Sequence, residues 1–262
     1  MTEELALRVC EIARKAGQYI RNERAGFSAK SIERKHAHDY VSYVDKSSEQ
    51  LIVTALRDIL PEAGFITEEG SATHTDEQLV WVVDPLDGTT NFIHEYAPYA
   101  VSIALCRGHE ILLGVVYEIC ADECFYAWAG GGAFLNGKPI HTSQQRIEDA
   151  LLCLQLPYNS EAYSPVAQRL IDHFYGKAAS IRMSGSAAMS LCYVAAGRLD
   201  AYAEKYIGQW DYMAGALIVK EAGGTVTDYD GTADFTQGDS VVATNGIVHD
   251  DLLQAIRGAM KS

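Results

Sequence analysis

An apolar run of the chain ends in two carboxylates, Asp84 and Asp87, and the segment Gly88-Thr89-Thr90 follows at once. Carboxylate oxygens are ligands that Mg²⁺ prefers in proteins. Backbone N–H groups at the start of a helix bind phosphate oxygens, because the helix dipole favours negative charge there. This order of residues predicts a site that holds Mg²⁺ and a phosphate side by side.

Two further acidic residues stand at the ends of apolar segments. Glu68 follows a short predicted strand, and Asp211 begins a predicted helix after Trp210. Carboxylates at strand ends point into the cleft where α/β proteins bind ligands. Taken singly, Asp87-Gly88 also fits a tight turn and Asp211 a helix N-cap. A turn needs neither Asp84 nor two threonines, so the combination favours a metal site.

The first half of the chain predicts helices packed on a sheet. Apolar residues at helical spacing predict a helix over 3–22 with Thr2 as its cap, and a second from near Lys46 to Pro61. Residues 40–44 alternate weakly and are expected to be extended. Short apolar runs predict strands, those from residue 100 onward forming an antiparallel meander; the runs are 65–67, 79–83, 100–106, 111–117 and 124–128.

In the second half, predicted strands alternate with helices, which is typical of an α/β lobe. The strands are expected at 151–154, 199–203, 226 and 241–244, and the helices at 165–174, 187–196, from 210 to the Gly223-Gly224 stop, and 250–257. The first half reads instead as an α+β lobe. We therefore expect two lobes, 1–142 and 143–262, with the phosphate segment and most metal ligands in the first.

Composition narrows the class of partner. The formal net charge is -14, so nucleic acid is not an expected partner, whereas a small phosphate can bind where metal ions neutralise the carboxylates. The N-terminus is acidic where a secretion signal is basic, and no apolar run reaches the roughly 20 residues of a membrane helix. The six cysteines form no CxxC pair, which favours reduced thiols. We expect a cytoplasmic protein without a membrane partner.

Taken together, these motifs resemble the signatures of the inositol monophosphatase family, in the superfamily of Mg²⁺-dependent, lithium-sensitive phosphatases. The matching segments are Glu68-Glu69, the run from Asp84 to Phe92, the run from Trp210 to Ala216, and Glu221-Ala222-Gly223-Gly224. The similarity extends from about residue 5 to 256. It implies a layered αβαβα sandwich of the inositol monophosphatase and fructose-1,6-bisphosphatase type, and a homodimer.

The resemblance also implies the metal ligands. Glu68, Asp84 and the carbonyl of Leu86 would hold one Mg²⁺. Asp84, Asp87 and Asp211 would hold a second, and a looser third ion would lie near Glu68. Mg²⁺ keeps several waters, so a few shared carboxylates suffice for two to three ions.

Catalytic and phosphate-binding roles follow from the same resemblance. Thr89 would pair with Asp45 to orient the attacking water, and Glu68 would share that water as base or orienter. The N–H groups of Gly88 and Thr89 would bind the phosphate. Asp45 also fits an N-cap of the helix beginning near Lys46. No covalent enzyme nucleophile is required.

The substrate side is implied less specifically. The backbone of Gly185, Ser186 and Ala187 would face the polyol, with Glu204 and Asp211 accepting its hydroxyl hydrogen bonds. Gly208-Gln209 stands where well-known inositol phosphatases carry His-Cys, which leaves the substrate open. The roles of three further residues also stay open: Glu69, Lys35 and His94.

The activity implied is hydrolysis of myo-inositol 1-phosphate, or of a similar small polyol phosphate, by metal-activated water. Alternatives within the superfamily are histidinol phosphate, fructose 1,6-bisphosphate or another sugar phosphate. An alternative of a different class is a non-catalytic scaffold that binds metal and phosphate.

Overall fold

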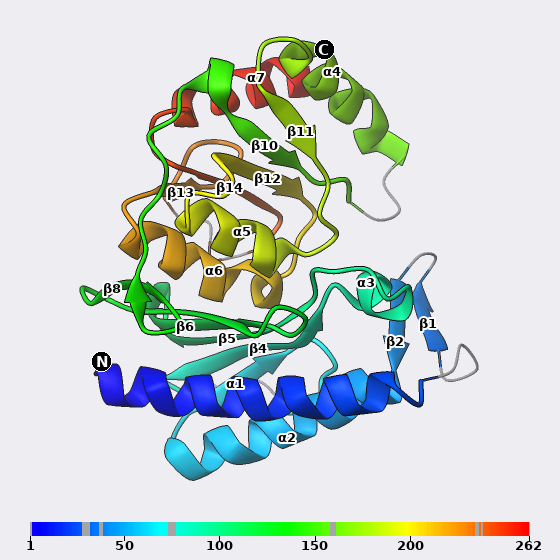
Figure 1. Ribbon diagram of the computed structural model, residues 1–262, viewed down its shortest axis with the longest axis vertical. Coiled ribbons are helices and arrows are strands. Elements are labelled where there is room, and N and C mark those ends of the chain that lie inside the picture. The colour runs from blue at the N-terminus through cyan, green and yellow to red at the C-terminus, as the bar shows by residue number, and fades with distance from the viewer. Residues whose placement is uncertain are drawn as a thin grey trace.

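Helices and sheets alternate through five layers in the computed structural model (Figure 1), which describes residues 2–27, 32–36, 39–72, 77–157, 161–233, 236 and 238–261. Helices α1 (Glu3–Arg24) and α2 (Tyr43–Ile59) cover the outer face of one sheet. Helices α5 (Ala187–Ala195) and α6 (Gln209–Glu221) lie between the two sheets. Helices α4 (Ser164–Phe174) and α7 (His249–Lys261) cover the second sheet. The predicted αβαβα sandwich is confirmed.

The first sheet has seven strands in the order β3-β4-β5-β6-β7-β8-β9. Its strands are β3 (Gly64–Thr67), β4 (Val80–Asp87), β5 (Ala100–Arg107), β6 (Glu110–Glu118), β7 (Glu123–Trp128), β8 (Gly132–Leu135) and β9 (Lys138–Pro139). β3 pairs parallel with β4, and every later pairing is antiparallel. The meander predicted from residue 100 onward is confirmed, and β8 and β9 extend it.

The second sheet is mixed, in the order β11-β10-β12-β14-β13. Its strands are β10 (Leu151–Leu154), β11 (Ser180–Arg182), β12 (Ala201–Lys205), β13 (Thr225–Thr227) and β14 (Ser240–Thr244). β10 runs parallel to both neighbours, and the other pairings are antiparallel. Residue 142 lies between the two sheets in sequence, but α5 and α6 belong to a buried cluster shared with both. The division into two lobes therefore stays a prediction.

The N-terminal helix forms where its apolar stripe and cap indicate. The Thr2 hydroxyl accepts a hydrogen bond from the Leu5 N–H at 3.3 Å, which satisfies one of the free donors at the helix start. Val9, Ala16 and Ile20 are fully buried. They recur near helical spacing, so one face of α1 packs on the sheet while the other stays polar.

The segment before α2 differs from the prediction. β1 (Ile32–His36) and β2 (Asp39–Ser42) form a two-stranded antiparallel ribbon, but Tyr43 and Val44 already belong to α2. The expected extension of residues 40–44 is therefore wrong for its last two residues. Asp45 consequently lies inside the first helical turn and is not the N-cap. The side chain of Lys35, in β1, lies outside the described residues.

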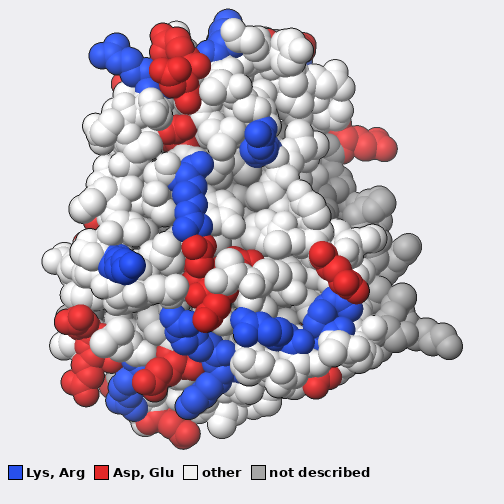
Figure 2. All heavy atoms as spheres, viewed as in Figure 1, with Lys and Arg blue, Asp and Glu red and all other residues white. Residues whose placement is uncertain are grey.

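Short 3₁₀ helices complete the described elements, at Ile147–Asp149 and Glu161–Tyr163. All six cysteines are free. Among the described helices, none is long and apolar enough to cross a membrane. Acidic and basic side chains are interspersed over the face shown in Figure 2, so that face carries mixed charge.

A close backbone contact joins α6 to the first sheet, and it predicts a stability effect. A Cβ on Gly114 in β6 would lie 2.5 Å from the carbonyl oxygen of Ala214 in α6. Gly114→Ala should therefore separate these elements and cost about 2 kcal/mol or more, lowering Tm by roughly 5 °C in a thermal melt.

Gly258 in α7 is the matched control, because a Cβ there meets nothing within 4 Å. Gly258→Ala should raise the helix propensity and leave Tm equal or higher. Equal Tm values for Gly114→Ala and the wild type would contradict this packing.

Candidate active site

The two carboxylates of β4 face the same cleft because the strand is irregular at its end. Residues three apart on a regular strand point to opposite faces. Between the pairs Asp84–Ser102 and Asp87–Ala100, β4 advances by three residues and β5 by only two. The extra residue is a β-bulge, a device that redirects side chains at the edge of functional sites.

Gly88 then turns the chain into a short helix, α3 (Thr89–Ile93). It has φ +88°, in the left-handed region, and caps the helix start. A Cβ there would lie 3.2 Å from the Pro98 carbonyl oxygen and 3.3 Å from that of Gly185. Both constraints favour glycine. The predicted helix start at Gly88-Thr89 is confirmed.

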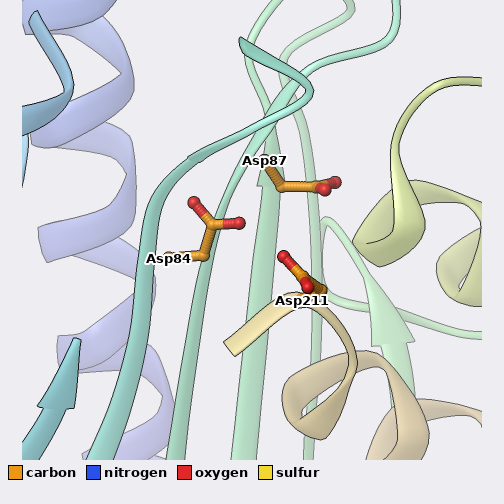
Figure 3. Close-up of side chains that lie close together, drawn as sticks. All are labelled: Asp84, Asp87 and Asp211. Atoms are coloured by element: carbon orange, nitrogen blue, oxygen red, sulfur yellow. The ribbon is translucent and has the colours of Figure 1, made fainter. Parts of the chain in front are cut away.

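Three carboxylates converge at this point (Figure 3). Asp84 and Asp87 come from the end of β4, and Asp211 is the third residue of α6. One oxygen of each lies within 4.8 Å of the others. The Gly208 N–H donates to the Asp211 carboxylate at 2.8 Å, so Asp211 supports the helix start from inside the first turn and is not the N-cap. The chemistry of this donor set, hard oxygens at short mutual distances, fits a divalent cation such as Mg²⁺.

Burial and mutual repulsion act on all three acids. Asp84 is 1% exposed, and burial, followed by the charges of Glu68, Asp87 and Asp211, holds its pKa well above the usual range. The same two causes raise the pKa of Asp211. Uncompensated carboxylates this close destabilise one another, so a bound cation would relieve a real electrostatic cost.

Asp87 differs from the other two because α5 stabilises its charge. Burial raises the pKa of Asp87 to about 7, although hydrogen bonds from three donors act to lower it. These are the Ser186 hydroxyl and the N–H groups of Ala187 and Ala188, the latter two at 3.2 and 3.1 Å. Hydrogen bonds to the charged form and the positive end of a helix both favour a carboxylate.

The side chain of Ser186 has a role that the sequence did not indicate. It is 1% exposed, caps α5 by accepting from the Met189 N–H at 3.2 Å, and donates to Asp87. Gly185 and Ala187 line the cleft, but Ser186 does not. The Ser186 side chain thus positions Asp87, while the expected contact of its backbone with the substrate stays a prediction.

Asp45 and Thr89 meet although 44 residues separate them. The Thr89 hydroxyl lies 3.2 Å from the Asp45 carboxylate and 3.1 Å from the Leu86 carbonyl oxygen. Asp45 is fully buried. The Leu86 N–H in turn donates to Asp84 at 2.8 Å, which fixes that carboxylate beside the turn. The structure thus brings the expected pair together, while its role in orienting water stays a prediction.

Glu68 reaches the cleft from the end of β3, where its N–H donates to the Val83 carbonyl at 3.2 Å. A buried acid that the sequence did not suggest supports this loop. Glu49 of α2 is fully buried and accepts from the N–H groups of Glu69 and Ser71, at 2.8 and 2.7 Å. No local pattern marks Glu49, because its partners lie about 20 residues away in sequence.

The cleft continues from the acids toward β12, where Glu204 lies. Its carboxylate accepts a hydrogen bond from the Tyr202 hydroxyl. Burial raises the pKa of Glu204 to about 8. The hydrogen bond from Tyr202 acts to lower this pKa, and the charge of Asp87 acts to raise it further.

The structure adds cleft residues that the sequence analysis did not select: Thr90, Gln155, Tyr206 and Ile207. Gln155 accepts from the Gly185 N–H at 3.4 Å. Two residues whose roles were open, Glu69 and the exposed His94, are not among the described residues that line the cleft.

Comparison with known proteins agrees with this geometry. The family model described as "Inositol monophosphatase family" matches residues 1–261. Inositol monophosphatase 2 from Solanum lycopersicum is 41% identical over 263 residues, covering 97% of this chain and 98% of the relative. Nus factor SuhB from Escherichia coli K12 is 37% identical over 247 residues, covering 94% and 92%.

A solved structure shares the fold. The extragenic suppressor protein suhB from Bartonella henselae aligns with a TM-score of 0.91 at 34% identity, covering 97% of this chain and 99% of that one. The family model, the relatives and the shared fold all extend over nearly the whole length. The chain belongs to the inositol monophosphatase family.

Proposed function

We propose that the protein is a Mg²⁺-dependent phosphomonoesterase that hydrolyses myo-inositol 1-phosphate or a similar small polyol phosphate. The observation that carries the proposal is the cluster of Asp84, Asp87 and Asp211 at the start of α3. Family membership supports it independently. It also supports a homodimer, a cytoplasmic location and inhibition by Li⁺, which stay predictions.

We infer that the site holds two to three Mg²⁺ ions. Glu68, Asp84 and the Leu86 carbonyl would hold one, and Asp84, Asp87 and Asp211 a second, with a looser third near Glu68. Bound magnesium supplies positive charge for the phosphate oxygens and makes water a better nucleophile at neutral pH.

The chain's own groups would then place the water and the phosphate. Because the Thr89 hydroxyl donates its hydrogen bond to Asp45, its oxygen can accept a hydrogen bond from a water and so orient that water. Glu68 can act as a base and take a proton from the same water. The N–H groups of Gly88 and Thr89 would hold phosphate oxygens at the start of α3, which favours negative charge. Water would attack phosphorus directly as the bond from phosphorus to the alcohol oxygen breaks. The proton that the attacking water gives up would balance the one that the leaving alkoxide takes up, and no side chain would form a covalent intermediate.

The leaving alcohol would lie on the far side of the cleft. Glu204 and Asp211 can accept hydrogen bonds from its hydroxyls. The backbone of Gly185, Ser186 and Ala187 would face the same alcohol. Carboxyl oxygens offer several acceptor sites, which suits a partner rich in hydroxyl groups.

A second candidate has a specific observation in its favour. Relatives at 37% identity carry the name Nus factor SuhB, which does not name a hydrolase. A non-catalytic scaffold is therefore the alternative of a different class. Its site would not need the Asp45–Thr89 pair, which argues for the enzyme.

Phosphate release from a panel of monoesters, with Mg²⁺ and with or without Li⁺, separates these proposals. The panel is myo-inositol 1-phosphate, histidinol phosphate, fructose 1,6-bisphosphate and glycerol 2-phosphate. We expect Mg²⁺-dependent release that is highest for the inositol ester. No release from any ester at any Mg²⁺ concentration would refute the enzyme and favour the scaffold.

Asp87→Asn should lower kcat/KM by at least about a hundredfold, because it removes a metal ligand and its charge. The fold should persist, since the amide oxygen can replace the carboxylate oxygen that accepts from the Ser186 hydroxyl and the Ala188 N–H. The exposed Asp172 of α4 provides the matched control, and Asp172→Asn should behave as wild type. Near-normal turnover of Asp87→Asn would mean that Asp87 only forms a turn.

The stabilising effect of Mg²⁺ should increase with pH. In the metal-free fold the pKa of Asp87 is about 7, above the value of about 3.9 for an unfolded chain. A raised pKa stabilises the fold at low pH, and this stability is lost as pH rises through 7. Mg²⁺ replaces the proton, so the Mg²⁺-induced rise in Tm should be larger at about pH 8 than at about pH 6, by about 3 °C. An equal rise at both values would contradict metal binding at Asp87.

A further inference from the structure

Tyr206 lies in the cleft with a backbone conformation that tyrosine rarely adopts. Its φ is +61°, in the left-handed region, and it follows directly on β12. Such a conformation is costly for a bulky residue and persists only where the surroundings enforce it. At a functional site, this is reason to ask what the side chain does there.

The end of the second sheet enforces this conformation. The Tyr206 N–H donates to the Asp239 carbonyl, and the Asp239 N–H donates to the Ile207 carbonyl at 3.1 Å. Asp239 is itself left-handed, with φ +85°. Its carboxylate also pairs with the Lys205 ammonium. Tyr206 and Asp239, both with positive φ, thus hold each other's backbone conformation through hydrogen bonds between their two segments.

The ring of Tyr206 rests on buried aromatic groups. Tyr206 is 55% exposed, and its ring packs edge-to-face on Tyr163, with ring centroids 6.3 Å apart at 75°. The Tyr163 hydroxyl bonds that of Tyr229 at 2.8 Å, and both residues are buried. This packing already restricts the exposed ring of Tyr206. A ligand that binds to the ring therefore costs little additional side-chain entropy.

The ring's charge environment narrows the ligand that suits it. The Lys205 ammonium lies 5.3 Å from the ring centroid. The cation already makes the cation–π contact that the ring offers on this face, so a second cation would gain no such contact there. Neutral C–H groups do not need that contact. Glu204 and Ile207 line the same cleft, so the ligand meets both a hydrogen-bond acceptor and an apolar side chain there.

The geometry points to Tyr206 as a residue that determines specificity, by packing against the C–H face of a cyclic polyol or sugar as the leaving group. This inference rests on the proposed phosphatase function. A linear alcohol offers no flat face to the ring, and a cationic amino alcohol such as histidinol meets Lys205. Cyclic neutral alcohols are therefore preferred to both.

The test compares kcat/KM for myo-inositol 1-phosphate, glycerol 2-phosphate and histidinol phosphate in wild type, Tyr206→Gly and Tyr206→Phe. Tyr206→Gly should lose about tenfold on the inositol ester, mainly through KM, and little on glycerol 2-phosphate. Tyr206→Phe keeps the ring and should stay close to wild type. Since glycine suits a positive φ, the Tm of Tyr206→Gly should not fall.

Glu95→Gly is the matched control, because Glu95 is also left-handed at φ +55° and exposed, but does not line the cleft. It should leave the substrate preference unchanged. An unchanged inositol-to-glycerol ratio in Tyr206→Gly, a loss shared equally by all esters together with a lower Tm, or a wild-type preference for histidinol phosphate would each overturn the role of Tyr206 alone. A wild type that cleaves no ester would refute the proposed function and this inference with it.

Discussion

The repulsion among buried carboxylates is the constraint on which this site depends. Asp84, Asp87 and Asp211 have oxygens within 4.8 Å of one another, and their pKa values are raised by burial and by neighbouring charges. Only a well-packed framework can hold such groups together, because each would otherwise turn toward water. The same repulsion would favour the binding of a divalent cation, so the cost to stability and the proposed metal binding have one origin.

The layered fold meets this constraint by directing three helix starts at one place. α5 donates N–H groups to Asp87, α6 carries Asp211 in its first turn, and α3 begins at Gly88 where a phosphate is proposed to bind. Helix N-termini carry partial positive charge. α5 and α6 are held between the two sheets, so their starts are fixed by the packing of the whole molecule.

Much of this could be predicted from local patterns. Apolar periodicity located most helices and strands, and Asp84, Asp87 and Asp211 were recognisable because each stands at the end of an apolar element. Contacts across long sequence separations could not be predicted in this way. The support that Glu49 gives to the Glu68 loop is one case, and the bond from Ser186 to Asp87 is another. The strained backbone of Tyr206 also has no sequence signature, because hydrogen bonds to a distant segment impose it.

The central claim is that these carboxylates form a divalent metal site. Anomalous diffraction from crystals soaked in Mn²⁺, which can replace Mg²⁺ among oxygen ligands, tests it most directly. We expect strong peaks within coordination distance of Asp84, Asp87 and Asp211, with the shared ligand Asp84 between two of them. Crystals that show no peak among these three carboxylates at saturating Mn²⁺ would contradict it.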